Sequence, residues 1–251
     1  MIETLKKQVK WRKDRKAFFV RDCKRSIDLK LALEHKPFLK KLSCGVNENE
    51  LNEVEKAIFL EFKKVGFLTS LEIRNIPFRD FYLAMKILDE ELGAKRVRDS
   101  EFLKEKFKEF PEFFIGIYLD NELIGVICGF PRDGYLLISE IAVDCRFQRR
   151  KFGEMLMGKF EEIGFEKYDK INVGALDSSI EFYKSLDYKP FLLIQFEKEV
   201  YGREDFSDFE ILRFCQRSVE IGIKDCSLRE LNRLRKIYSK ASLQYIFTKG
   251  K

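Results

Sequence analysis

Apolar and polar positions along the middle of the chain follow two spacings, one typical of strands and one typical of amphipathic helices. The helical spacing predicts helices over residues 77–92 and 100–110, the first beginning at Pro77 and ending before Gly93. The alternating spacing predicts strands over residues 70–76, 113–119, 122–130, 135–143 and 170–176. Asp120 and Asn121 separate two of these strands, and a turn through Gly134 separates the next two, so we expect consecutive hairpins.

The most informative stretch is residues 138–153, which read I-S-E-I-A-V-D-C-R-F-Q-R-R-K-F-G. An alternating apolar run ends at Asp144, crosses a loop rich in cations and continues into a helical pattern. The first backbone N–H groups of a helix have no intrahelical acceptor, and the helix dipole adds to their positive potential. We therefore expect this loop to bind an anion, most simply a phosphate. An ordinary basic loop before a helix is the alternative.

The loop resembles the pyrophosphate-binding signature [RQ]-x-x-G-x-[GA] of the GNAT superfamily, the acyl-CoA-dependent N-acetyltransferases. The six positions are taken in register by Gln148, Arg149, Arg150, Lys151, Phe152 and Gly153. Lys151 stands where the signature has its first glycine. If that position needs a positive φ, lysine costs roughly 1 kcal/mol relative to glycine. If it does not, Lys151 adds a third cation beside Arg149 and Arg150.

A second segment, residues 177–191, is similar to the family's other signature, N-x-x-A-x-x-F-Y-x-x-x-G-F. Phe182 and Tyr183 match it, whereas Asp177 stands in the place of the asparagine. A half-buried aromatic side chain whose hydroxyl reaches water is the alternative interpretation of Tyr183.

The resemblance covers about residues 69–198 and implies a mixed α+β fold, with a central, mostly antiparallel sheet flanked by helices. We accordingly expect a GNAT domain at residues 67–198. The remaining segments, residues 1–66 and 199–251, are expected to form a smaller α+β domain from the two ends of the chain.

The same resemblance implies an acetyl-CoA-dependent N-acetyltransferase, a transferase acting on a primary amine. Glu140 takes the position of the general base and Tyr183 that of the general acid. Acetyl-CoA would be held by the strand backbone, the loop and the second signature, at Ile141, Ala142, Val143, Gln148, Arg149, Arg150, Lys151, Phe152, Gly153, Glu154 and Asp177. The acceptor stays open among protein, peptide, RNA-linked and small amines. The only histidine, His35, precedes this region, which disfavours a Ser-His or Cys-His hydrolase.

Composition predicts a cytoplasmic protein that does not act at a membrane. No apolar run approaches about 18 residues, and the first ten residues have no signal-peptide core. The six cysteines form no C-x-x-C pair, so we expect reduced thiols and no metal. A zinc site from the four cysteines of the flanks is a weaker interpretation than small buried side chains, at Cys23, Cys44, Cys215 and Cys226.

Charge is distributed unevenly. Residues 1–41 hold 14 Lys and Arg against 5 Asp and Glu, a net of +9, and residues 200–251 hold 11 against 7, a net of +4. The total is +6, so the middle of the chain carries −7. Basic flanks indicate an acidic partner such as RNA, DNA or the ribosome, and a solvated basic face is the alternative.

The two flanks also resemble each other. Residues 21–31 and 213–223 align without gaps as R-x-C-x-R-S, followed by alternating apolar positions. We interpret them as two related strand-strand-helix halves that pack together, against the alternative of chance similarity. The repeated arginines and serine would either bind phosphate or flank two hairpin turns. A second functional class follows, an acyl-CoA-sensing or nucleic-acid-binding module on a degenerate GNAT fold, and the flanks are also candidates for a homodimer contact.

Overall fold

The computed structural model describes residues 2–93, 100–198 and 200–251. The described chain divides into two compact units. Unit 1 contains the residues up to 127 together with residues 140–160, and unit 2 contains residues 128–139 and 161–251. Two strands and one helix continue from one unit into the other: β8 (Glu122–Arg132), β9 (Tyr135–Val143) and α5 (Phe152–Lys167).

Unit 1 holds one half of a large, mostly antiparallel sheet, in the order β5-β1-β6-β7-β8-β9. Its further strands are β1 (Ile2–Leu5), β5 (Val46–Asn47), β6 (Leu68–Asn75) and β7 (Phe114–Leu119). Two helices lie between β6 and β7 in sequence, α3 (Phe81–Leu92) and α4 (Ser100–Glu109). All six residues of β7 are buried, as expected for a central strand covered on both faces.

The predicted hairpins are present. Asp120 and Asn121 have φ values of 48° and 66°, and Asp133 and Gly134 have 48° and 86°. Two consecutive left-handed residues match the twist of the flanking strands, which is why Asp, Asn and Gly occupy these turns. Turn chemistry and alternation together therefore predict that β7, β8 and β9 follow one another as neighbouring strands.

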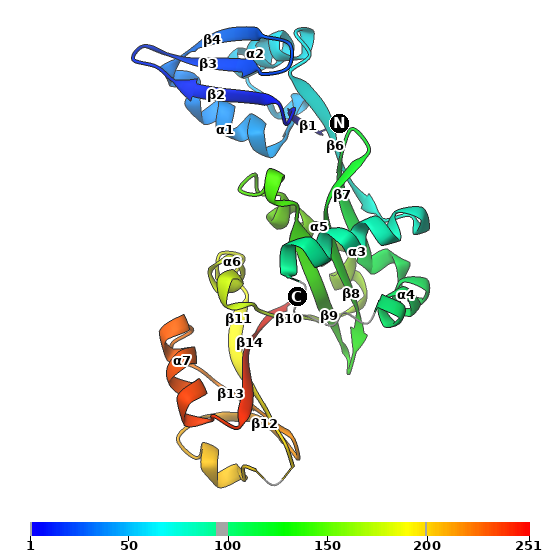
Figure 1. The fold of residues 1–251 in the computed structure, drawn as a ribbon, viewed down its shortest axis with the longest axis vertical. Helices are drawn as coiled ribbons and strands as arrows, with labels where there is room; N and C mark the ends of the chain where they lie inside the picture. Colours follow the sequence, from blue (N-terminus) through cyan, green and yellow to red (C-terminus); the bar gives the residue numbers. More distant parts are fainter. Residues whose placement is uncertain (1, 94–99, 199) are drawn as a thin grey trace. The chain divides into compact units, whose positions relative to one another are not determined.

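The N-terminal part of unit 1 is a small α+β subdomain. A separate three-stranded sheet, in the order β2-β3-β4, packs against two helices (Figure 1, blue to cyan). The elements are β2 (Val9–Lys13), β3 (Ala17–Asp22), β4 (Ile27–Ala32), α1 (Lys36–Cys44) and α2 (Glu53–Lys64). Its core joins one face of the sheet to the helices through Phe18, Val20, Phe38, Leu42, Phe59 and Phe62. The N-terminal end of the chain thus forms a small α+β part within unit 1.

Gly45 explains how the subdomain returns to the large sheet. Its φ is 104°, and a Cβ at this position would lie 2.9 Å from a methyl group of Leu71 and 3.0 Å from one of Ile2. Only glycine combines that backbone with so close an approach of β1 and β6.

Unit 2 holds the other half of the large sheet, in the order β9-β10-β14-β11-β13-β12. The strands are β10 (Lys170–Gly174), β11 (Lys189–Phe196), β12 (Ile211–Cys215), β13 (Ser218–Ile221) and β14 (Ala241–Gly250), with helices α6 (Ile180–Lys184) and α7 (Leu228–Ile237). Strand β10 runs parallel to β9 and antiparallel to β14.

The C-terminal segment differs from the separate half that the sequence predicts for residues 199–251. Strand β14 lies between β10 and β11 and pairs antiparallel with both, and β13 extends the same sheet from β11. Leu243, Tyr245 and Phe247 point to the core side and are buried, because alternate residues of a strand face opposite sides of the sheet. The last strand of the chain is thus a central strand of unit 2.

The two copies of the repeat form hairpins, one in each unit. The first turns between β3 and β4 and the second between β12 and β13. The expected packing of the two copies against each other stays a prediction. Among the described residues, no helix combines the length and the apolar character needed to cross a membrane.

The position of β14 gives a stability prediction. Phe247 is fully buried, and its ring centroid lies 5.4 Å from that of Tyr183. We expect Phe247→Ala to lower the free energy of unfolding by about 3–5 kcal/mol, because it removes a large buried ring and leaves a cavity. Urea denaturation followed by circular dichroism measures the change. Ile237→Ala, at a 53% exposed position of the same unit, is the control and should change stability by less than about 0.5 kcal/mol. Equal effects of both changes would contradict the central position of β14.

Candidate functional site

Strand β9 presents the predicted strand residues in strict alternation. Glu140 and Ala142 lie on the buried side with Leu136 and Ile138, whereas Ile141 and Val143 are half-buried on the other side. Glu140 is 8% exposed, one of few charged side chains buried among the described residues. A carboxylate on the buried face of an otherwise apolar strand is costly unless it is partnered or used. The alternation expected from the sequence is therefore present, with Glu140 on the enclosed face.

The loop between β9 and α5 contains two left-handed residues. Arg149 has a φ of 64° and Lys151 a φ of 61°. Of the two readings of Lys151, the one that needs a positive φ is the one observed. A lysine there is strained by roughly 1 kcal/mol relative to glycine. The backbone thus takes up the conformation for which the signature has glycine, although this chain supplies a lysine.

The backbone N–H groups of this loop point to no protein acceptor. Within the described residues, no carbonyl or side chain accepts from the N–H groups of Arg149 through Gly153, and the first loop bond to helix α5 runs from Met155 N–H to Lys151 O at 3.0 Å. Left-handed residues next to right-handed ones turn successive N–H groups toward one side, which makes an anion-binding concavity. The start of helix α5 adds its dipole to the same position. This arrangement is typical of a loop that holds an anion.

The three cations of the loop, Arg149, Arg150 and Lys151, differ in exposure and in their contacts. Arg149 and Lys151 are exposed, and Lys151 Nζ lies 3.6 Å from the Glu154 carboxylate. The Arg150 guanidinium is instead half-buried and donates from Nη1 to the Leu5 carbonyl at 3.2 Å. Burial lowers the pKa of Arg150, which nevertheless stays charged because a guanidinium ionises so high. Arg150 therefore fastens strand β1 to the loop, while Arg149 and Lys151 remain the cations exposed to a ligand.

Gln148 also has a structural contact. Its Nε2 donates to the Val143 carbonyl and to the Glu91 carboxylate, both at 2.9 Å. Glu91, at the end of helix α3, accepts a second bond from the Cys145 N–H at 2.7 Å. These bonds fix the distance between the end of β9 and the start of the loop. Glu91 was not predicted from the sequence, because it lies more than fifty residues from its partners.

One group of potential metal ligands lies beside the loop. Oxygen and sulfur atoms of Glu91, Asp144 and Cys145 come within 4.8 Å of one another. Asp144 accepts from the backbone and the guanidinium of Arg146, which holds the pKa of Asp144 below its ordinary value. The charge of Glu91 raises the pKa of Cys145, which disfavours its thiolate form. These carboxylates serve the loop as hydrogen-bond acceptors.

Tyr183 lies in unit 2 on helix α6, within an aromatic cluster. It is 3% exposed, and its ring centroid lies 5.2 Å from Phe182 and 5.4 Å from Phe247. The side chain is more enclosed than the half-buried alternative from the sequence. Burial raises the pKa of Tyr183 well above its ordinary value of 10.0. The hydroxyl therefore keeps its proton at neutral pH, which is the state that a general acid requires.

Asp177 meets a cation from the C-terminal segment. The Arg235 guanidinium donates to both of its carboxylate oxygens, at 2.8 and 3.0 Å, in the paired geometry typical of arginine with carboxylate. These bonds lower the pKa of Asp177. The position that the signature fills with asparagine is therefore tied to helix α7. Arg235 was not predicted, since nothing in the local sequence links it to residue 177.

The repeated arginines follow the hairpin interpretation at Arg25. Its Nε donates to buried Asp22 at 2.7 Å, and its Nη2 donates to the Gly66 carbonyl at 3.0 Å. Arg25 thus connects the β3–β4 turn to the end of helix α2. Arg21 lies 3.8 Å from Asp28 across the sheet and is exposed.

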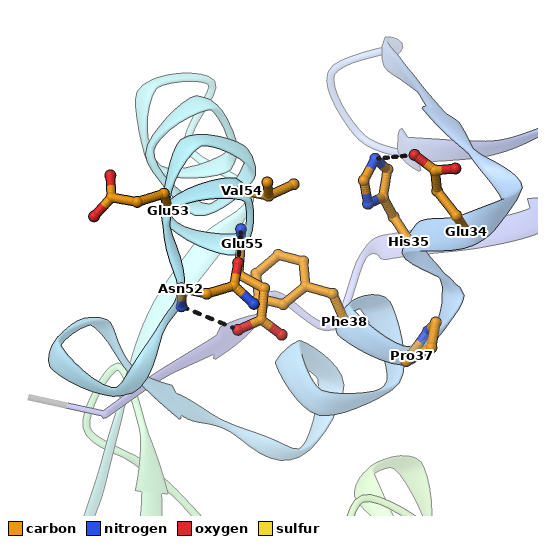
Figure 2. Close-up of a pocket in the computed structure, with 8 residues that line it drawn as sticks. All are labelled: Glu34, His35, Pro37, Phe38, Asn52, Glu53, Val54 and Glu55. Atoms are coloured by element: carbon orange, nitrogen blue, oxygen red, sulfur yellow. Dashed lines mark hydrogen bonds and ion pairs between the residues drawn. The ribbon is translucent and has the colours of Figure 1, made fainter.

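Cavities occur away from these residues. Figure 2 shows one of about 570 Å³ between the start of α1 and the start of α2, lined by Glu34, His35, Pro37, Phe38, Asn52, Glu53, Val54 and Glu55. Asn52 and Glu55 cap helix α2 reciprocally, so their polar atoms are already used. A second, of about 460 Å³, lies in unit 2 and is lined by Tyr201, Asp205, Asp208, Phe209, Arg233, Ile237 and Tyr238. Neither is lined by a residue predicted from the signatures.

Comparison with known proteins places the loop and helix α6 within one family. Residues 71–188 match the sequence profile described as the acetyltransferase (GNAT) family. No curated protein sequence is significantly similar to the chain.

The solved structures that are similar to the chain include two from archaea and one from a plant. A putative acetyltransferase from Pyrococcus horikoshii is 21% identical over 53% of this chain and 49% of its own, with a TM-score of 0.41. Ard1 from Thermoplasma volcanium is 18% identical over 60% of this chain and 95% of its own, with a TM-score of 0.45. Arabidopsis thaliana Naa50, in complex with the bisubstrate analogue CoA-Ac-MVNAL, is 14% identical over 72% of this chain and 99% of its own, with a TM-score of 0.46.

The backbone of the loop gives a second stability prediction. We expect Lys151→Gly to raise the free energy of unfolding by about 0.5–1 kcal/mol, because glycine adopts a positive φ without strain. Lys56→Gly, at an exposed position within helix α2, should lower it by about 1 kcal/mol. Thermal and urea unfolding of the two variants measure both changes. Destabilisation by Lys151→Gly as large as that by Lys56→Gly would mean that residue 151 is not left-handed in solution.

Proposed function

We propose that the protein transfers an acetyl group from acetyl-CoA to a primary amine, because the chain belongs through residues 71–188 to the acetyltransferase (GNAT) family. The observation that carries the proposal is the loop between β9 and α5. Its N–H groups from Arg149 to Gly153 are free of protein acceptors, and Arg149 and Lys151 are left-handed. Such a loop at a helix start fits the pyrophosphate of CoA.

Several loop residues act by shaping the site rather than by contact. Arg150 and Gln148 are bonded to Leu5 and to Val143, so they hold the loop in place. Arg149 and Lys151 are exposed cations beside the free N–H groups, and we assign the phosphate contacts to them and to the backbone as far as Glu154. We assign the acyl-carrying arm to the backbone of Ile141, Ala142 and Val143, on the strand that leads into the loop.

Acetyl-CoA supplies an acetyl group activated as a thioester. Transfer to an amine needs a base that takes the proton of the amine and an acid that protonates the departing sulfur. In the proposed reaction Glu140 removes the amine proton, directly or through a water molecule. Tyr183 donates its hydroxyl proton to the sulfur. The buried position of Glu140 and the raised pKa of Tyr183 support these assignments, because each group is in an environment that departs from bulk water.

Asp177 has a positioning role in this proposal. Its carboxylate is held by Arg235, so it joins the segment before helix α6 to helix α7. Helix α6 carries Tyr183, only six residues further along the chain. The Asp177–Arg235 pair therefore limits where helix α6 begins, and hence how Tyr183 is presented.

Binding of the co-substrate tests the loop. We expect isothermal titration calorimetry to show saturable acetyl-CoA binding in the micromolar range or tighter, on the order of −8 kcal/mol. Gly153→Val should abolish it, because a branched side chain at the start of the helix blocks backbone approach. Gly158→Val is the matched control on the same helix, since a Cβ at Gly158 meets no atom within 4 Å. Absence of binding by the folded wild-type protein would remove the proposal.

The role of Tyr183 is tested by kinetics. Tyr183→Phe should lower kcat by about 10²- to 10⁴-fold and leave acetyl-CoA affinity unchanged, because only the proton donor is lost. In the wild type, the rate should show no falling limb at the ordinary tyrosine pKa of 10.0, since a raised pKa keeps the hydroxyl protonated beyond that pH. Stopped assays with a panel of peptide and small amines supply the measurement. Undiminished turnover by the variant would assign the proton to another donor, and acetyl-CoA binding without turnover of any amine would favour an acyl-CoA sensor.

A further inference from the structure

The three-stranded sheet of the N-terminal subdomain has a second face, opposite the helices, on which charged side chains are exposed. Val9, Trp11, Val20 and Leu29 belong to the face that packs against α1 and α2. By strand alternation and register, the opposite face, which we call the open face, carries Lys10 and Arg12 of β2, Phe19 and Arg21 of β3, and Asp28 and Lys30 of β4. The five charged members are all exposed.

The open face has a strong and largely unneutralised positive charge. It holds four cations and one carboxylate, a net of +3, and the carboxylate of Asp28 lies 3.8 Å from Arg21. Lys10, Arg12 and Lys30 have no acidic partner among the residues that the structure describes. Arg15, Lys16 and Lys24 add charge at the two turns of the sheet. Exposed cations in this number attract a polyanion.

The pairing of the strands places like charges together. Lys10 lies directly opposite Arg21 across the β2–β3 pair. Directly opposed like charges destabilise an antiparallel sheet. An anion bound over the pair would relieve this repulsion, so the arrangement is better suited to a complex than to a bare surface.

An aromatic ring stands at the centre of the cations. In the next row of the sheet Phe19 lies between Arg12 on β2 and Lys30 on β4. Phe19 is half-buried, although its neighbours on this face are charged and exposed. A large apolar ring flanked by two cations on an open sheet offers a surface on which a flat ring can stack.

We propose that the open face binds a single-stranded nucleic acid, with a base stacked on Phe19 and phosphates at Lys10, Arg12, Arg21 and Lys30. Unpaired bases stack on aromatic side chains of open sheets while cations hold the backbone. An acidic protein would use the charges but not the ring. A duplex hides its base faces, so it too would gain nothing from Phe19. This inference is independent of the proposed acetyl transfer, because it involves none of the residues assigned to that reaction.

Fluorescence anisotropy of the full chain with labelled oligouridine and oligothymidine tests the proposal. We expect saturable binding whose log K falls linearly with log salt concentration. Phe19→Ala should weaken it by about tenfold to a hundredfold, Phe19→Leu by a similar factor, and Phe19→Tyr by little, because tyrosine keeps the ring. Lys30→Ala should reduce the salt slope by about 0.7.

Matched controls separate this surface from general charge. Lys56→Ala removes an exposed lysine on helix α2 of the same subdomain and should leave binding unchanged. Duplex DNA and polyglutamate should bind more weakly than the single strands and should be insensitive to Phe19→Ala. Binding unaffected by both Phe19→Leu and Lys30→Ala in variants that unfold like the wild type would overturn the proposal. So would stronger binding of polyglutamate than of oligouridine.

Discussion

The turn from strand β9 into helix α5 is the constraint on which the candidate site depends. The chain must leave a strand whose buried face carries Glu140 and enter a helix within a few residues, and it does so through left-handed Arg149 and Lys151. That conformation is what turns the N–H groups of the loop away from protein acceptors. Hydrogen bonds to residues outside the loop hold the strained backbone at Lys151 in place. Arg150 is bonded to Leu5, and Gln148 is bonded to Val143 and Glu91. An unusual backbone persists when its surroundings overdetermine it, and such backbones concentrate at functional sites.

The sequence predicts those parts of the structure that depend on neighbouring residues in the chain. The hairpins at Asp120 and Asp133 follow from residues that tolerate a positive φ. Helices α3 and α4 follow from periodicity, and α3 ends before Gly93 as predicted. It begins at Phe81 rather than at Pro77, since residues 78–80 form a 3-10 turn. The orientation of Glu140 follows from alternation alone. The two interpretations of Lys151 differ in the φ angle that they require at this residue. The observed φ of 61° agrees with the one that needs a positive φ.

The rest depended on contacts between residues far apart in the chain. Residues 241–250 alternate like a strand, yet nothing in them states that the strand inserts between β10 and β11. The repeat R-x-C-x-R-S was a true local similarity, since both copies are hairpins, but Arg25 bonds to Asp22 where the second copy has Phe214. The short repeat therefore indicates a turn in each copy, and the packing of the two copies against each other stays a prediction. Glu91 and Arg235 were missed because a hydrogen bond across fifty or more residues leaves no periodic trace.

The sequence gives the net charge of whole segments, whereas the structure shows which individual cations are bonded within the protein. The net charge of the first 41 residues does not show which cations are already bonded. Arg25 is bonded to Asp22 and Gly66. The strand register instead places Lys10, Arg12 and Lys30 on one sheet face, where none of them has an acidic partner among the residues described. The same distinction applies in the loop, where Arg150 holds the backbone and its neighbours face solvent. In both places a cation bonded to a carbonyl or a buried carboxylate shapes the protein, and an adjacent exposed cation faces solvent. Attraction of an anion is therefore carried by fewer residues than the composition suggests, and those residues are set by the register of the strands and the φ angles of the turns.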